Sequence, residues 1–234
     1  MRFLPVILAA ITVASCAAQQ HSLTAIAAAS LKGRHVAVTE RRPPHGSVSV
    51  PGSSTVNVGG LVGALGGLAA MSAAGARITR ENGVADSTPY VAGQLSNDAQ
   101  RRYGLQPAQQ RLAIVGDDAP TEIAAAHPSA DLVLDVRTGW SLGPISYNSS
   151  KYYLTYTAHL RLIDTKIVHL IDGKKGAVIA DGTCSHSTDK TARAPSYDEF
   201  LAQKAQRLKD EIGLAARFCV DELRSKVLTI GPPQ

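Results

Sequence analysis

The chain has 234 residues, 44% of them hydrophobic and 18% charged, which is typical of a single globular domain. Its net charge of +5 comes from scattered basic pairs that are not interleaved with stacking aromatic residues, so the composition argues against a nucleic-acid-binding protein. Aromatic residues make up only 5%, so we expect a core of aliphatic and small side chains.

The first fifteen residues have the pattern of an export signal. One positive charge at Arg2 precedes an apolar stretch that is too short to span a bilayer, and small residues follow up to Cys16. Residues 13–16 resemble the bacterial lipobox, which implies removal of residues 1–15 and lipidation of Cys16. Ala17 is not the aspartate that retains such lipoproteins in the inner membrane, so the resemblance implies a Gram-negative outer membrane, facing the periplasm. The alternatives are a plain signal peptide with an incidental Cys16, or a soluble N-terminal helix.

The remaining chain divides into a short tether, one domain and a tail. Residues 16–32 are small and polar, as a lipidated tether requires, and we expect them to be disordered or loosely helical. Residues 33–228 form the predicted domain, beginning with a strand at 33–39, and residues 229–234 form a C-terminal tail.

Residues 58–76 carry no charge and contain Gly59, Gly63 and Gly67 at a helical spacing of four. Three interpretations stay open for this stretch. It is a buried or partly disordered soluble segment, a membrane contact that lies on the surface, or a membrane span of low hydrophobicity.

Further along the chain, helices alternate with strands. Ser87, Thr88 and Pro89 start a helix that Gly104 ends, and residues 111–115 form a short strand. A second short helix covers 120–127 and ends before Pro128.

Three strands with alternating side chains form the centre of the predicted fold. They cover residues 130–138, 151–163 and 176–184, and the longest keeps a period of two for about twelve residues. Turn residues around Gly173 favour an antiparallel meander. We therefore predict an α+β fold, a mostly antiparallel sheet with helices packed on one face.

The C-terminal helix connects to this sheet through two cysteines. Ser196 and Glu199 have capping-box spacing, and apolar positions from Leu201 to Leu223 recur at helical period. Cys219 lies on the apolar face, and Cys184 shares the parity of buried strand positions. We predict a Cys184–Cys219 disulfide, because disulfides persist in the periplasm; two free buried thiols are the alternative.

The search for catalytic or cofactor chemistry yields little. The seven histidines include no pair at metal-ligand spacing, no Cys-x-x-Cys occurs, and no nucleotide-binding fingerprint is present, so no cofactor is expected. Glycan hydrolysis uses a pair of carboxylates, so aspartates such as Asp135 and Asp181 leave a glycan hydrolase as an alternative function. Trp140 is expected in a loop between strands, where it is either an exposed partner contact or a cap on the core, and the contact is favoured because loops hold binding residues. Lys174 and Lys175, at a hairpin tip, are the other candidate partner contacts.

Five stretches resemble an uncharacterised family of proteobacterial outer-membrane lipoproteins: 130–137, 156–165, 178–184, 197–201 and 219–223. A more distant, fold-level resemblance links the ADLVLDV and RLID motifs to the domain of curli-secretion lipoproteins and penicillin-binding-protein activator lipoproteins. Residues 167–175 lengthen the hairpin relative to the family, so a family contact at that tip does not transfer directly to this chain.

The resemblance and the lipobox imply a lipid-anchored envelope protein. We expect a non-enzymatic binding or assembly partner of another envelope protein or of peptidoglycan, with no nucleic-acid partner. The alternatives are an inhibitor or immunity protein against a periplasmic toxin, and a periplasmic cell-wall or glycan hydrolase.

Overall fold

The structure is a computed structural model that describes residues 20–41, 46–49, 61–108, 119–146, 149–168, 173 and 175–230, with the backbone alone for 61–68. The helices are α1 (Ala25–Ala29), α2 (Leu61–Asn82), α3 (Thr88–Tyr103), α4 (Pro120–Ala126) and α5 (Tyr197–Lys226). The strands are β1 (His35–Val38), β2 (Ser47–Val48), β3 (Gln106–Pro107), β4 (Leu132–Pro144), β5 (Tyr152–Val168) and β6 (Lys175–Ser187). This combination confirms the α+β class.

The sheet is mixed, because only its C-terminal part is antiparallel. Its order is β3-β1-β4-β5-β6, and β2 also pairs with β4. The antiparallel β4–β5–β6 meander is as predicted. The short N-terminal strands pair in parallel: β1 with β3 and β4, and β2 with β4.

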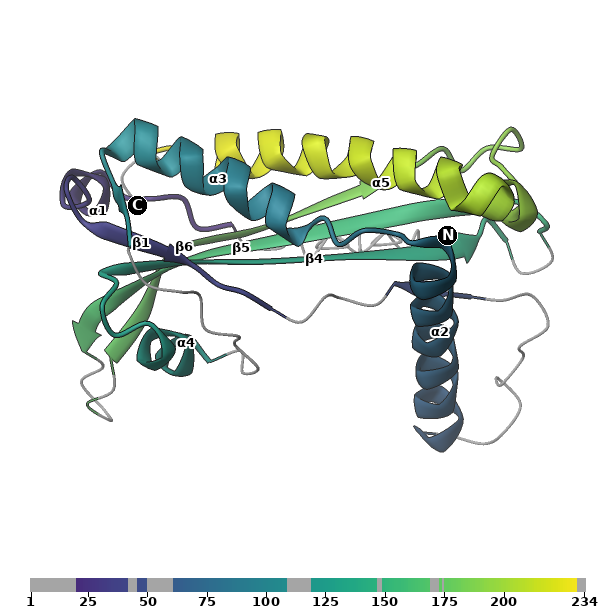
Figure 1. Cartoon of the computed structure of the whole chain (residues 1–234), viewed down its shortest axis with the longest axis horizontal. Coiled ribbons are helices and arrows are strands. Elements are labelled where there is room, and N and C mark those ends of the chain that lie inside the picture. The colour runs from purple at the N-terminus through teal and green to yellow at the C-terminus, as the bar shows by residue number, and fades with distance from the viewer. Residues whose placement is uncertain are drawn as a thin grey trace, which may run out of the picture.

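The two faces of the meander differ in what covers them. Alternate residues of β5, including Leu154, Tyr156 and Leu160, are buried in the main core with residues of α3 and α5. Figure 1 shows both helices running along this face. The short helix α4 lies on the other side, where Ile123, Val133 and Ile163 form a second, smaller core. Two long helices therefore occupy one face, as expected, while α4 covers part of the opposite one.

The start and end signals of the helices are largely where the sequence places them. Ser196 and Glu199 form a complete capping box at the start of α5, and Gly104 ends α3 in the left-handed conformation at φ 65°. One difference lies inside α5, where Gln203, Lys204 and Ala205 all have positive φ and interrupt the helix. The hydrophobic period continues across this break, which is why periodicity alone predicts one uninterrupted helix.

The stretch expected as a tether is packed on the domain from Gln20 onward. Leu23 and Leu31 flank α1 and are fully buried. The backbone of His21 exchanges two hydrogen bonds of 2.9 Å with Asp181 of β6. At the other end of the chain, Ile230 forms an isolated bridge with Leu23, so the predicted tail begins against the domain as well.

Helix α2 covers most of the uncharged stretch and projects away from the sheet (Figure 1). Its C-terminal half contacts the body through Ile78, which is buried, and Gly75, which lies so close to the Gly46 carbonyl that a side chain would clash. Ala69, Ala70 and Ala73 are exposed. Within the described ranges no helix has both the length and the apolarity that crossing a bilayer requires.

Candidate functional site

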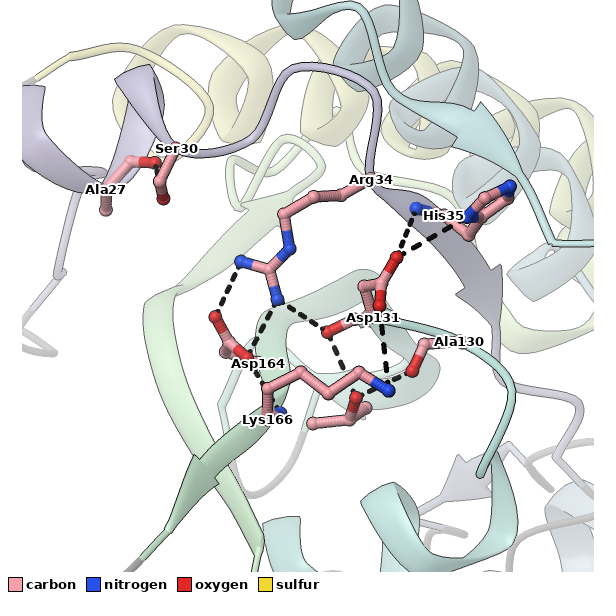
Figure 2. Close-up of polar contacts among 9 residues, drawn as sticks. Ala27, Ser30, Arg34, His35, Ala130, Asp131, Asp164 and Lys166 are labelled. Atoms are coloured by element: carbon pink, nitrogen blue, oxygen red, sulfur yellow. Dashed lines mark hydrogen bonds and ion pairs between the residues drawn. The ribbon is translucent and has the colours of Figure 1, made fainter.

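A cluster of charged side chains lies at the end of the sheet where β1 and β4 begin and β5 curves away (Figure 2). Its centre is Arg34, whose two terminal nitrogens reach the two carboxylate oxygens of Asp164 at 2.7 and 2.9 Å. The nitrogen Nη2 also donates to the backbone carbonyl of Asp131 at 3.0 Å. This bidentate geometry fixes the start of β1 against β5, because both hydrogen bonds are charge-assisted.

Asp131, which directly precedes the central strand β4, belongs to the same cluster at the end of the sheet. Its Oδ2 accepts the His35 backbone N–H at 2.9 Å, and its Oδ1 lies 3.6 Å from Lys166 Nζ. The buried Thr165 hydroxyl donates to the Ala130 carbonyl at 2.6 Å. We call Arg34, His35, Asp131, Asp164 and Lys166 the sheet-end cluster.

Both carboxyl groups of this cluster are held in the charged form. For Asp131, the backbone hydrogen bond from His35 is the largest cause that lowers the pKa. For Asp164, burial raises the pKa, but the hydrogen bonds from Arg34 and from the Lys166 backbone outweigh it, so the pKa lies below the ordinary value. The charged side chains of this cluster are therefore held in place by hydrogen bonds and ion pairs to one another.

A cavity of about 330 Å³ lies beside the sheet-end cluster, between α4 and the turn end of the β5–β6 hairpin. Thr165, Lys166 and Lys175 line it from the strands, and Thr121 and Glu122 line it from α4. The lining residues carry two positive charges and one negative charge, and Lys166 is also ion-paired with Asp131 of the sheet-end cluster. We call it the hairpin pocket.

The three predicted contact residues have different outcomes. Lys175 is exposed at the start of β6 and lines the hairpin pocket, and Lys174 lies outside the described residues. The loop position expected for Trp140 is wrong. Trp140 lies within β4 opposite Tyr156, its ring packs over Gly46, and it contacts the main core.

Asp135 is fully buried on the face opposite α5 and is held by arginines. Its Oδ1 accepts from Thr39 Oγ1 at 2.9 Å and Arg41 Nε at 2.7 Å, and its Oδ2 accepts from Arg161 Nη2 at 2.6 Å. Burial raises the pKa, but the hydrogen bonds from Arg41 and Arg161 outweigh it and hold the pKa below its ordinary value. A general acid for glycan cleavage needs the opposite shift, so this environment does not favour the hydrolase role.

Asp181 of β6 lies opposite Arg161 of β5 in the strand register, on that same face. Among the described residues, no cluster of three or more histidine, cysteine, aspartate or glutamate side chains is arranged to hold a metal ion.

The disulfide is present as predicted. Cys184 of β6 and Cys219 of α5 are bonded, with Cα atoms 5.4 Å apart. Both residues are fully buried. Cys16, the predicted lipidation site, lies outside the described residues.

Sequence reasoning missed the sheet-end cluster as a unit. Asp131 directly precedes β4, and Asp164 of β5 lies opposite Leu132 in the antiparallel register, so the predicted meander is enough to bring the two aspartates together. Arg34 could not be added, because its place depends on the parallel pairing of β1 with β4 across about a hundred residues.

Comparison with known proteins yields little for this chain. No protein-family model and no curated protein matches it. A hypothetical protein from Chlamydia trachomatis aligns with 82% of this chain and 95% of its own, at 10% identity and a TM-score of 0.35. A neuraminyllactose-binding hemagglutinin homolog from Helicobacter pylori aligns with 83% and 91%, at 13% identity and a TM-score of 0.23. Similarity at this level supports no argument about function.

Proposed function

We propose that this chain is a lipid-anchored lipoprotein of the outer membrane that binds another envelope component through the hairpin pocket. The observation that carries the proposal is the pair Lys166 and Lys175, placed at one cavity by the antiparallel strands β5 and β6; the sheet-end cluster also fixes β5. A preformed cationic cavity suits an acidic segment of an envelope protein or polymer. The role is binding and assembly, in keeping with the resemblance to envelope lipoproteins.

Two features of the chain support an envelope location. The Cys184–Cys219 disulfide suits an oxidising compartment such as the periplasm. The lipobox-like residues before Cys16 suit export and acylation. Several acyl chains, at about 0.8 kcal/mol per buried methylene, hold a protein on a membrane permanently.

The anchor would hold the domain close to the bilayer. Gln20 is fixed to β6, where its side chain donates to the Thr183 carbonyl at 3.1 Å. Only four peptide units separate Cys16 from Gln20, and they span at most about 14 Å. The partner is therefore expected at the membrane surface.

The anchor is tested by intact-mass measurement of the membrane fraction. We expect a species that begins at Cys16 and carries acyl chains, and we expect Cys16→Ala to release the protein into the periplasm. A species that retains Met1, or one that begins at Cys16 without added acyl mass, would show that the lipobox interpretation is wrong.

The binding surface is tested by crosslinking and capture from native envelopes. Lys166→Glu with Lys175→Glu reverses the charge of the hairpin pocket, and we expect recovery of the partner to fall at least about tenfold, because like charges then face each other. The control, Lys190→Glu with Arg193→Glu, makes the same charge change in the loop after β6, at the opposite end of that strand. Thermal unfolding of both variants checks that they fold.

Two outcomes would overturn the proposal. Full capture by the pocket variant would exclude the hairpin pocket as the contact surface. Digestion of peptidoglycan by the purified protein, lost in Asp135→Asn, would show that the protein is a hydrolase.

A further inference from the structure

A second cavity of about 330 Å³ lies on the other face of the sheet, between the start of α3 and the middle of α5. Its walls are partly apolar and come from Val84, Tyr90, Ile212 and Ala216. Tyr90 is 44% exposed, although α3 and α5 bury most of their other large apolar residues. We call this cavity the α3–α5 pocket. Its size is at the lower end of the range for small-molecule sites.

Gly213 provides the space on the α5 side of this cavity. A Cβ atom at Gly213 would meet nothing within 4 Å, so packing does not require a glycine at this position. A glycine inside a helix costs stability relative to alanine. The position therefore accepts a larger side chain sterically, and such a side chain would occupy the α3–α5 pocket.

Two cations of α5 line the α3–α5 pocket. Lys209 and Arg217 are eight residues apart, about two helical turns, so they lie on the same side of the helix. Neither forms an ion pair with any other described residue, whereas Arg224 and Lys226 further along α5 are paired. The carboxylate in the lining, Asp86, already accepts the Thr88 backbone N–H at 2.8 Å. The lining thus has two cations for one carboxylate.

Ser87 lines the pocket, but its hydroxyl is engaged in the protein interior. Ser87 precedes α3 as its N-cap residue, yet its side chain makes no capping hydrogen bond. Its hydroxyl lies 2.8 Å from the Tyr156 hydroxyl and 3.2 Å from Thr138 Oγ1, both in the protein interior. This buried network fixes the Ser87 side chain at the pocket lining.

We propose that the α3–α5 pocket binds a small amphipathic anion, with a carboxylate or phosphate head between Lys209 and Arg217 and an apolar body against Tyr90 and Ile212. This site is separate from the hairpin pocket, which lies beside α4 on the opposite face of the sheet. The two proposals therefore stand or fall independently.

Titration of the folded, disulfide-bonded domain with octanoate, followed by amide chemical shifts, tests the site. We expect saturable shifts at residues 83–90 and 209–217. Octyl phosphate should give the same pattern, because it shares the anionic head and the apolar body. Octanol has the apolar body without the charge, and we expect it to bind at least about tenfold more weakly.

Two matched glycine variants separate filling of the pocket from a general effect on helices. Gly213→Phe should abolish octanoate binding, because the ring occupies the cavity. Gly93→Phe removes a glycine from α3 at an exposed position that also has no atoms within 4 Å of a Cβ, and should leave binding unchanged. Lys209→Gln with Arg217→Gln should weaken binding of octanoate about tenfold and leave binding of octanol unchanged.

The proposal is overturned if octanoate produces no saturable shifts in these two segments, or if octanol binds as tightly as octanoate. It is also overturned if Gly213→Phe, folded by the same spectra, still binds octanoate, or if Gly93→Phe loses binding to the same extent.

Discussion

Asp135 illustrates how single residues shape the face of the sheet that α5 leaves uncovered. Its carboxylate is fully buried and is held between Arg41 and Arg161. Removing one member of a buried ion pair leaves the other charges without compensation, and this costs about 3 to 5 kcal/mol. We therefore attribute a structural role to Asp135.

Asp135→Asn is expected to lower the free energy of unfolding at pH 7 by about 3 kcal/mol, measured by urea denaturation. Because the pKa of Asp135 in the folded protein lies below its unfolded value, the stability that it contributes is present above about pH 4 and is lost as the pH falls through the folded pKa. The difference between variant and wild type should thus shrink under acidic conditions.

Asp181→Asn is the matched control for this experiment. Asp181 lies opposite Arg161 on the neighbouring strand of the same face, but within the described part of the chain its carboxylate forms no salt bridge like that of Asp135. We expect less than about 1 kcal/mol of change. Equal losses in both variants would contradict a specific role for the arginine contacts of Asp135.

The sequence predicts the positions of some of these residues and not of others. Cys184 and Cys219 were placed correctly, because strand parity and helical period each fix a direction for the side chain. The loop prediction for Trp140 is wrong because Gly139 interrupts the alternation, so the pattern ends the predicted strand at Thr138 while β4 continues to Pro144. Contacts such as Arg34 with Asp164 join residues 130 positions apart and leave no local pattern.

At the scale of elements, the long regular segments were predictable and the short ones were not. Strands β4, β5 and β6 and helices α3, α4 and α5 all have a clear period or an end signal. Strands β2 and β3 have two residues each, too few to show a period. The parallel pairs of the sheet all involve these short strands or β1, so the sequence does not predict that the sheet is mixed.

The interruption of α5 has no sequence signal, since no glycine or proline occurs between Ala202 and Ala205. Three residues there have φ values of 53 to 57°, a region that costs L-amino acids with a side chain about 1 kcal/mol or more each. Glycine adopts this region without that cost.

Lys204→Gly is therefore expected to raise the free energy of unfolding by about 1 kcal/mol, measured by thermal and urea denaturation. Lys204 is exposed, so the substitution removes no buried contact. Glu211→Gly, in the regular part of α5, should lower stability by about 1 kcal/mol. A loss of stability in Lys204→Gly would contradict the left-handed conformation at this position.

At the scale of the whole molecule, the segment around His21 and helix α5 are both tied to one strand. Strand β6 pairs with β5, holds the N-terminal segment through His21, and carries Cys184. The disulfide connects this strand to α5, which covers the main core. Any loosening of α5 would expose that core, so we expect the disulfide to control the stability of the complete domain.

Reduction of the Cys184–Cys219 bond should lower the free energy of unfolding by roughly 3 to 4 kcal/mol. The two cysteines are 35 residues apart, and opening a loop of that length returns conformational entropy to the unfolded chain. Urea denaturation of the oxidised and the reduced wild-type protein measures this effect without creating a cavity, because the side chains stay the same. The slope of the transition should also rise, since the open unfolded chain exposes more surface.

The double variant Cys184→Ala with Cys219→Ala is the control, because the reductant should not change its denaturation curve. Equal stability of the oxidised and the reduced wild-type protein would show that the bond does not stabilise the domain.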